Sequence, residues 1–461
     1  MKLSNIVRSI VAGLSVLTAG AACSEIPDPM VIDVDQWQPV ADKYEYKTFT
    51  LKHPCLLHSQ SDIDYVKSHL SESPWAEAYA ELCATNYAKP DYKMHTPAEY
   101  VGRLDATNWS DGNGRWEQYG VADRWYSGVQ NSFLWLAQDA TAAYQNALRY
   151  NLEGNTQCAE KAWEILAAWA KVNKGVIIGQ AGSLKGQVID PNEYLILINI
   201  HHVTNAAELL RNYPGFEASD DFKTICHWLK TYWSSLAETF LESVQGGRHT
   251  WLNWDLAAMT AEISIGALCD DQDMINYAIR EFYEGNHPGN LMLLGAPFLF
   301  DDPDSDEMLA QGNEAGRDQG HNTLCAALLG AFCQMGLNIG EDLFAANNYR
   351  AVAMAEYVAK INVSMKAMGQ SFLHPINTIP FTEYTYGDAG TMTQIATGDR
   401  GPFRPCWDLW VGYCRSHGIS CIYASEFAEQ KRPDQGVGYY GSNSGGFDQI
   451  GFTTLMHYRP E

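Results

Sequence analysis

Basic residues are scarce in this sequence. The 461 residues include 31 lysines and arginines against 55 aspartates and glutamates, which gives a formal net charge of −24. Such an excess of negative charge repels nucleic acids and anionic membrane surfaces, so we expect neither as a partner. An anionic ligand is not excluded, because its binding depends on the field inside a cleft. It would require a local cluster of arginine, histidine and asparagine side chains.

Cysteine motifs are absent as well. The chain has 11 cysteines, but none forms a C-x-x-C pair or stands at the spacing of a zinc motif. Several lie within apolar helical patterns, where a free cysteine behaves as a small hydrophobic residue. The sequence therefore predicts few disulfides, no cysteine chemistry, no metal site and no cofactor.

Long apolar runs are limited to the N-terminus. Two basic residues precede an apolar run from Ile10 to Ala22, which is too short to span a membrane and ends in small residues. Gly20-Ala-Ala-Cys23 resembles the lipobox of bacterial lipoproteins, in which the cysteine is lipidated. We expect a signal peptide at residues 1–22 and an exported lipoprotein, anchored in the outer membrane through Cys23 on its periplasmic or cell-surface side. A plain secretory signal is the alternative. No later segment is expected to span a membrane.

Alternating strand patterns are also missing over most of the chain. Residues 23–48 contain three prolines and indicate a flexible tether, which leaves 49–461 as one domain. Ser61 and Asp64 have the spacing of a capping box that opens a first helix. Amphipathic periodicity then predicts successive helices, including about 194–212, 219–244, 254–269, 271–284, 319–336 and 341–361.

The predicted fold class is mainly all-α. Antiparallel helix hairpins repeated over this length form either an open solenoid or a closed ring. We favour a single incomplete (α/α)6–7 toroid with an irregular C-terminal segment, because no polar capping repeat is evident. The segment from Gly436 onward is rich in glycine and shows no periodicity.

Four polar residues occur at a spacing that normally marks a buried helix face. Glu314, Arg317, Asp318 and His321 follow one another in steps of three, one and three. The same face continues with apolar residues (Leu324, Cys325, Leu328, Leu329 and Phe332). Charged groups on a core-facing surface are costly unless they are paired or functional. We interpret them as a functional site, with a structural salt-bridge network as the alternative.

A second polar group lies between residues 245 and 255. Arg248, His249 and Asn253 come at the start of a predicted helix, next to Trp254. The free N–H groups of a helix N-terminus together with an arginine favour an anion. Asn253 and His249 would alternatively serve only local structure.

Further candidates are aromatic and basic. Tyr384 and Tyr386 alternate before Arg400 and Arg404, and Arg124 stands two residues before Tyr126 in a separate segment. One of the alternating tyrosine rings is expected to face a cleft, although a structural role is common for tyrosine in a chain this rich in aromatic residues.

Two apparent metal signals are weak. The acidic segment 301–307 resembles part of a calcium loop, but it lacks the glycine and the closing glutamate of that loop. His201 and His202 are adjacent on a helix, so their side chains diverge by about 100° and do not favour one shared ion.

These segments together resemble a known family. Residues 139–170, Asn253-Trp, Glu314-Ala-Gly-Arg-Asp-Gln-Gly-His, Arg404-Pro-Cys-Trp and Asn443-Ser-Gly-Gly-Phe are similar to the alginate-lyase-like, helical-toroid polysaccharide lyases. The resemblance covers most of residues 50–460. It implies an α/α toroid that cleaves uronate polysaccharides by β-elimination, so that 49–461 is a catalytic domain. It also implies an anionic polysaccharide as the partner, and we expect a monomer.

The resemblance and the residue patterns together give the candidate site. Asn253 and His321 match family positions, and Glu314 and Arg317 follow from the same motif. The catalytic candidates are His321, Arg317, Asn253, Glu314, His249, Tyr384 and Tyr386. The substrate-binding candidates are Arg248, Trp254, Asp318, Arg400, Arg404, Tyr126 and Arg124.

The chemistry suits these residue types. The C5 proton of a uronate becomes removable only when the adjacent carboxylate is neutralised, which is a task for preorganised donors. A histidine or tyrosine then takes the proton, and a tyrosine hydroxyl can protonate the departing O4. We predict a polyuronate lyase acting on a 1,4-linked polymer such as mannuronate-containing alginate or glucuronan. The alternatives are a glycoside hydrolase on the same ring, using two of Asp255, Glu314 and Asp318, or a non-catalytic glycan-binding lipoprotein.

Overall fold

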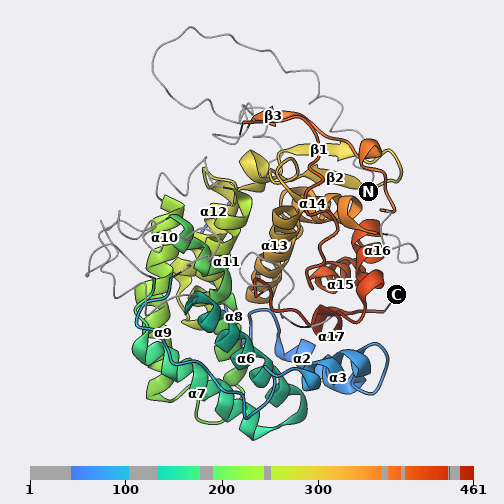
Figure 1. Ribbon diagram of the computed structural model, residues 1–461. Coiled ribbons are helices and arrows are strands. Elements are labelled where there is room, and N and C mark those ends of the chain that lie inside the picture. The colour runs from blue at the N-terminus through green and yellow to red at the C-terminus, as the bar shows by residue number, and fades with distance from the viewer. Residues whose placement is uncertain are drawn as a thin grey trace, which may run out of the picture.

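The computed structural model describes residues 43–102, 132–176, 191–242, 251–364, 372–385, 390–434, 436 and 447–460. Helices dominate these residues, and they are arranged as antiparallel hairpins around a common centre (Figure 1). The signal peptide predicted at 1–22 and Cys23 lie outside the described residues.

Five successive hairpins form most of the described ring. In each, an inner helix is followed by an outer helix that returns along it. The first pair is α6 (Ser132–Glu153) with α7 (Thr156–Val172). A 3₁₀ helix, η2 (Pro191–Asn199), leads into α8 (Ile200–Leu210), which returns through α9 (Asp220–Trp228), the π-helix η3 (Leu229–Ser234) and α10 (Ser235–Glu242). The remaining pairs are α11 (Leu252–Leu268) with α12 (Gln272–Glu284), α13 (Gln319–Ile339) with α14 (Ala346–Asn362), and α15 (Trp407–His417) with α16 (Ile422–Lys431).

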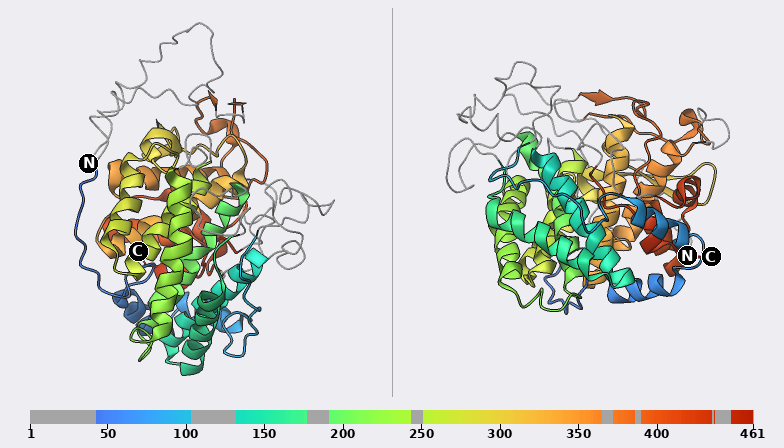
Figure 2. Two further views of the ribbon diagram at one scale, coloured as in Figure 1. Left: turned by 90° about the vertical axis from the view of Figure 1, so that its left-hand side faces the viewer. Right: turned by 60° about the horizontal axis from the view of Figure 1, so that its bottom comes forward.

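The two ends of the chain close the ring. The short helix α17 (Thr453–His457) packs against α15 and also against α2 (Gln60–His69) and α3 (Trp75–Ala84), which in turn contact α6. Figure 2 shows α2 and α3 beside the C-terminal elements in both views. The Arg459 guanidinium donates to Asp62 in α2 across this junction, at 2.9 Å. The predicted α/α toroid is confirmed.

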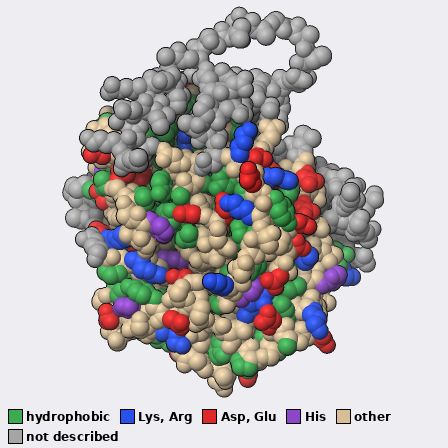
Figure 3. Space-filling view, turned by 180° about the vertical axis from the view of Figure 1, so that it is seen from behind, with side chains coloured by type: hydrophobic (Ala, Val, Ile, Leu, Met, Phe, Trp, Pro, Cys, Tyr) green, Lys and Arg blue, Asp and Glu red, His purple; other side chains and the backbone are tan. Residues whose placement is uncertain are grey.

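Burial separates inner from outer helices in most pairs; α14 is an exception, because β2 and α16 cover it and nearly all of its residues are buried. Every residue of α8 is buried, and so are nearly all residues of α11 and α13. In α12, by contrast, buried residues recur at helical spacing and the other face is more exposed. Seen from behind, acidic and basic side chains are interspersed over the described surface (Figure 3).

Helix α13 departs from one expectation. It is long and apolar enough to cross a membrane by length and composition, whereas no later segment was expected to be. However, 89% of its apolar window is buried inside the protein. Its apolarity is that of a core helix in contact with α11, α14 and α15.

Small β elements lie near the start of α13. Strand β1 (Phe298–Asp301) pairs antiparallel with β2 (Met308–Gln311), with Phe298 opposite Gln311. Strand β3 (Tyr384–Thr385) pairs with β4 (Thr391–Met392). Two single turns, η4 (Leu291–Gly295) and η5 (Ile376–Thr378), complete the described elements. Figure 1 places β1, β2 and β3 at the same end of the ring.

The acidic segment 301–307 forms the hairpin between β1 and β2 and is held by an internal cation. The buried Lys360 ammonium contacts the carboxylates of Asp302 and, at 2.8 Å, Asp304. The Tyr423 hydroxyl donates to Asp302. A lysine at this position takes the place that a calcium ion would need.

The tether predicted at residues 23–48 ends earlier than expected. The ring of Tyr44 stacks on that of Tyr283 with centroids 5.6 Å apart, and its hydroxyl donates to Asn276 in α12 at 2.5 Å. The Lys47 backbone N–H donates to the same Asn276 side chain at 2.8 Å. Residues 44–48 therefore pack on the domain, because their aromatic and hydrogen-bonding groups find partners along α12.

Candidate active site

The polar row at 314–321 does not lie on one helix, which corrects the prediction. Residues 313–317 form a separate turn, in which the Arg317 N–H donates to the Glu314 carbonyl at 2.9 Å. Asp318 is extended (φ −168°, ψ 160°) and caps α13, so only His321 is helical. A single helical turn has the same three-residue spacing as a helix, so Glu314 and Arg317 still share a side.

Glu314 is the fully buried centre of the cluster. Its Oε1 accepts from the Asn253 side-chain amide, and its Oε2 accepts from Arg317 Nη1 at 3.1 Å. Burial raises the pKa of Glu314 above its ordinary value, although the charges of Arg317 and His321 and the two hydrogen bonds oppose the rise. Asn253 comes from the first turn of α11, so this carboxylate joins α11 to the turn that precedes α13.

Asp318 orients His321. One carboxylate oxygen of Asp318 accepts the His321 backbone N–H at 2.8 Å, and the other lies 2.6 Å from His321 Nδ1. Burial alone would raise the pKa of Asp318, but the hydrogen bonds and charge of His321 outweigh it and lower the pKa. A carboxylate on Nδ1 leaves Nε2 as the ring nitrogen available for proton transfer, and no hydrogen bond joins Nε2 to the described residues.

Arg317 is held between a carboxylate and an aromatic ring. Its guanidinium lies 4.6 Å from the centroid of the Trp251 ring, while Nη1 contacts Glu314. The Arg317 side chain is 28% exposed and that of His321 is 19% exposed, so solvent reaches both. Trp251, the residue before α11, is absent from the sequence-based candidates, since its position next to Arg317 depends on a contact between distant segments.

Tyr384 supports the turn that carries Glu314. Its buried hydroxyl donates to the Asn313 carbonyl at 2.6 Å and accepts from the Gly316 N–H at 3.2 Å. Burial raises the pKa of Tyr384. A Cβ atom on Gly316 would lie 2.5 Å from Met392 Cβ, so this close approach of β4 requires glycine. The hydroxyl that was predicted to be catalytic thus bonds the backbone on both sides.

Two of the four predicted substrate-binding arginines, Arg400 and Arg404, have protein partners. Arg404 binds the Asp448 carboxylate through Nε and Nη2, and its Nη1 donates to the Gly320 carbonyl and Thr323 Oγ1 at the start of α13. Arg400 donates to the carbonyls of Ile361 and His374 and lies 3.7 Å from the ring centroid of Phe372. Both guanidinium groups therefore fix backbone segments around α13 and α14.

Other predicted residues are only partly placed. Trp254 is half-buried in α11, with its ring tilted by 30° to that of Phe240 at a centroid separation of 6.1 Å. The remaining candidates lie outside the described residues: His249, Tyr386, Arg248, Tyr126 and Arg124.

Next to Glu314, two buried amides have atoms without a partner among the described residues. They are Asn253 Oδ1 and Asn313 Nδ2. Asn253 donates to Glu314 through its amide nitrogen, and Asn313 directly precedes Glu314 in the sequence. Asn313 also accepts the Leu252 N–H at 3.4 Å, so it joins the Glu314 turn to α11. Its place immediately before Glu314 was a signal that the sequence-based candidates overlooked.

The cluster can neutralise the charge of a bound anion and can transfer a proton. Its described residues do not form a set of metal ligands. Arg317 and the Asn253 amide provide donors beside Glu314, and His321 provides a ring nitrogen held by Asp318. A divalent cation at Glu314 would have to displace the Arg317 guanidinium. Asp255, considered as a hydrolase acid, lies 3.6 Å from His287 Nδ1.

Comparison with known proteins agrees with this arrangement. The family described as alginate lyase matches residues 89–364 of this chain. The chain belongs to the alginate lyase family. It is a polysaccharide lyase, and the resemblance first seen in the sequence is confirmed. No protein with a curated description matches the chain.

Solved structures share the fold of this lyase. An alginate lyase from Bacteroides ovatus superposes with a TM-score of 0.56 and 15% identity, over 89% of this chain and 100% of that one. Alginate lyase A1-III from Sphingomonas species A1 gives a TM-score of 0.50 and 13% identity, over 89% and 100%. A histidine-to-alanine variant of A1-III complexed with a tetrasaccharide gives 0.52 and 12%, over 88% and 98%.

Proposed function

We propose that this lyase cleaves a 1,4-linked polyuronate, mannuronate-containing alginate or glucuronan, by β-elimination, releasing oligosaccharides with an unsaturated uronate end. The observation that carries the proposal is the joining of Asn253, Glu314 and Arg317 beside a histidine whose Nδ1 is held by Asp318. The tetrasaccharide in the related A1-III structures supports a polysaccharide partner.

Neutralising the substrate carboxylate is the first requirement of this reaction. We assign the task to Arg317 and the Asn253 amide, because both donate beside the same buried site. A substrate carboxylate next to Glu314 would raise the pKa of Glu314 further, since like charges disfavour ionisation. Glu314 then takes up a proton and presents no charge that repels the substrate.

Removing the C5 proton is the second requirement. We assign it to His321 through Nε2, with the Asp318 carboxylate stabilising the imidazolium that forms. The electrons of the C5–H bond form the C4–C5 double bond, and the C4–O4 bond breaks. The leaving O4 then receives a proton. In this scheme Arg404 positions His321 and does not bind the substrate. It donates to Gly320 and Thr323, which lie one residue before and two residues after His321.

The stereochemistry of the sugar favours these two substrates. In mannuronate and glucuronate, H5 and O4 lie on the same face of the ring, so one group can take the proton and return it to O4. In guluronate they lie on opposite faces, and two groups are required. A single group such as His321 suffices for mannuronate and glucuronate, so we rank these substrates above guluronate. For guluronate a second group would be required as the acid, and His249 and Tyr386 are the candidates.

A substrate panel tests the proposal. The purified protein is incubated with polymannuronate, polyguluronate, glucuronan and a neutral glucan, and ultraviolet absorbance of the unsaturated product is followed. We expect product from polymannuronate or glucuronan and none from the glucan. New reducing ends without ultraviolet absorbance would instead indicate hydrolysis and would contradict the assignment.

We also propose that the enzyme acts as a monomeric lipoprotein anchored at Cys23. The lipobox-like Gly20-Ala-Ala-Cys23 supports this placement. Labelling of the wild-type protein, but not of a Cys23→Ala variant, with a fatty-acid probe is the expected result. An unlabelled wild-type protein secreted in soluble form would indicate a plain secretory signal. Size-exclusion chromatography with light scattering tests the monomer.

A further inference from the structure

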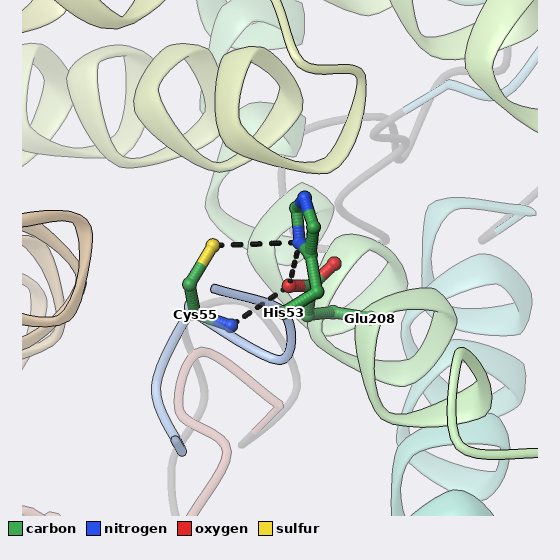
Figure 4. Close-up of side chains that lie close together, drawn as sticks. All are labelled: His53, Cys55 and Glu208. Carbon is green, nitrogen blue, oxygen red and sulfur yellow. Dashed lines mark hydrogen bonds and ion pairs between the residues drawn. The ribbon is translucent and has the colours of Figure 1, made fainter. Parts of the chain in front are cut away.

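A second cluster of chemically reactive side chains lies away from the candidate active site. It joins His53 and Cys55 of the N-terminal segment to Glu208 of α8 (Figure 4). Cys55 Sγ lies 3.5 Å from His53 Nδ1, which lies 2.6 Å from Glu208 Oε1. One donor atom from each residue lies within 4.8 Å of the other two, and Cys55 and Glu208 are buried.

The donor set is the one that zinc uses. Thiolate, imidazole and carboxylate bind Zn²⁺ at about 2.3, 2.0 and 2.0–2.2 Å in tetrahedral sites. Two such ligands, a sulfur and a nitrogen, stand about 3.5 Å apart around a tetrahedral zinc ion. The Sγ–Nδ1 separation already has this value. The shorter Nδ1–Oε1 contact would open by a few tenths of an ångström to about 0.7 Å on binding.

The surroundings of the cluster resemble those of a metal site. His53 Nε2 lies 3.0 Å from Asp270 Oδ1, and a carboxylate on the far nitrogen orients a metal-bound histidine. The Glu208 carboxylate is fixed from two sides, since Oε1 accepts the Cys55 N–H at 2.8 Å and Oε2 accepts Arg211 Nε at 3.0 Å. The ligands are therefore held before any ion arrives.

Charge balance leaves room for a cation. Arg211 faces three carboxylates, those of Glu208, Glu217 and Asp270. One arginine does not neutralise three acids, so a negative surplus remains whenever His53, which also contacts Glu208 and Asp270, is neutral.

We propose that His53, Cys55 and Glu208 bind one Zn²⁺ ion, with water as the fourth ligand, and that the ion fastens the N-terminal segment to the ring. Binding replaces the S–H bond by a Zn–S bond and releases the thiol proton to solvent. No metal site was expected from the sequence.

The site is structural and separate from the chemistry at Glu314. Asp270 follows the end of α11, whereas Asn253 lies in its first turn. A helix of 17 residues is about 25 Å long, so the two sites stand at opposite ends of the ring. Loss of zinc should therefore lower stability without removing the catalytic groups.

Metal content and a spectroscopic probe test the proposal on the full domain. We expect about one zinc per chain by mass spectrometry after exhaustive dialysis. Exchange with Co²⁺ should give a sulfur-to-cobalt charge-transfer band, which Cys55→Ser abolishes. Cys83→Ser, a half-buried cysteine elsewhere, is the matched control and should keep the band. A chain without stoichiometric zinc and without the band, or a band that persists in Cys55→Ser, would overturn the proposal.

A second variant covers the case in which Cys55→Ser does not fold. Asp270 is 61% exposed and has φ 55°, a conformation that asparagine tolerates well. Asp270→Asn should fold and bind zinc about 10- to 100-fold more weakly, measured by competition with a chelator. Unchanged zinc affinity in this variant would contradict the role given to His53 as a ligand.

Discussion

The Asn253 side-chain amide donates to the carboxylate of Glu314, which lies 61 residues further along the chain. This bond joins the first turn of α11 to the turn that precedes α13. It brings an amide, a guanidinium and a carboxylate to one buried point, with a histidine beside them. The predictions below separate the groups that contact the substrate from those that hold others in place.

Arg317 should be essential for neutralising the substrate carboxylate. We expect Arg317→Ala to lower kcat/KM about 100- to 1,000-fold, as loss of a preorganised donor does. Arg317→Lys should recover little, because a lysine cannot keep both the Glu314 contact and the stacking on Trp251. Arg280→Ala, which removes an exposed arginine paired with Glu281, is the control. Activity within threefold of wild type in Arg317→Ala would remove Arg317 from the site.

Asp318 should act through His321. Asparagine is also a good N-cap, so Asp318→Asn should keep α13 intact while it removes the negative partner of the imidazole. We expect kcat to fall about 100-fold or more, with a small change in KM and a shifted pH profile. Asp220→Asn, at the exposed start of α9, is the matched control. A purely structural Asp318 would lower thermal stability and leave the pH profile of kcat in place.

Tyr384 should support the turn rather than transfer a proton. Tyr384→Phe loses a bond to the Asn313 carbonyl and leaves the Gly316 N–H without its acceptor, so stability should fall by about 1–3 kcal/mol. Activity should fall in parallel with it. Tyr150→Phe, which loses a hydroxyl bond to the Asn212 carbonyl, is the control. If Tyr384→Phe kept its melting temperature but lost kcat by several orders of magnitude, the tyrosine would be the acid or base.

Asp434 should make stability depend on pH. Burial raises the pKa of Asp434 to about 7, and the nearby Asp408 charge adds to the rise. The folded state then holds a proton that the unfolded chain releases above its ordinary pKa. The free energy of unfolding should therefore fall by up to a few kcal/mol as pH rises from about 4 to about 7, and should level off above that.

Chemical denaturation at several pH values measures this effect. Asparagine does not titrate, so Asp434→Asn should show a smaller decline than the wild type over the same interval. The difference between the two slopes is the readout, because other groups titrate in both proteins. Equal slopes would mean that Asp434 stays ionised in the folded protein.

Much of the fold could be predicted because helical periodicity is a local property. The expected helices at 254–269, 271–284 and 341–361 correspond to α11, α12 and α14 within a few residues. The errors arise where two alternative local structures require the same residue spacing. The first helix is capped by Ser59 and Asp62 rather than by Ser61 and Asp64, and both pairs are three residues apart. The turn at 313–317 was interpreted as helix for the same reason.

The site could be predicted only in part, because its partners are distant in sequence. Glu314, Arg317 and His321 share one motif, whereas the contact of Arg317 with Trp251 depends on how α11 meets α13. The His53, Cys55 and Glu208 cluster spans 155 residues, and no spacing rule brings it together. Arg400 and Arg404 are of a residue type that often binds anionic ligands. In the structure, however, Arg400 donates to a backbone carbonyl and Arg404 to the Asp448 carboxylate.

Closure of the ring through α17 has a consequence for how the enzyme is made. The last described helix completes the contacts of α2 and α3, and Arg459 reaches Asp62 across 397 residues. During synthesis from the N-terminus, the earlier hairpins lack the contacts made by α17 until the last part of the chain has been synthesised. The described ring can therefore close only after α17 and Arg459 have been made.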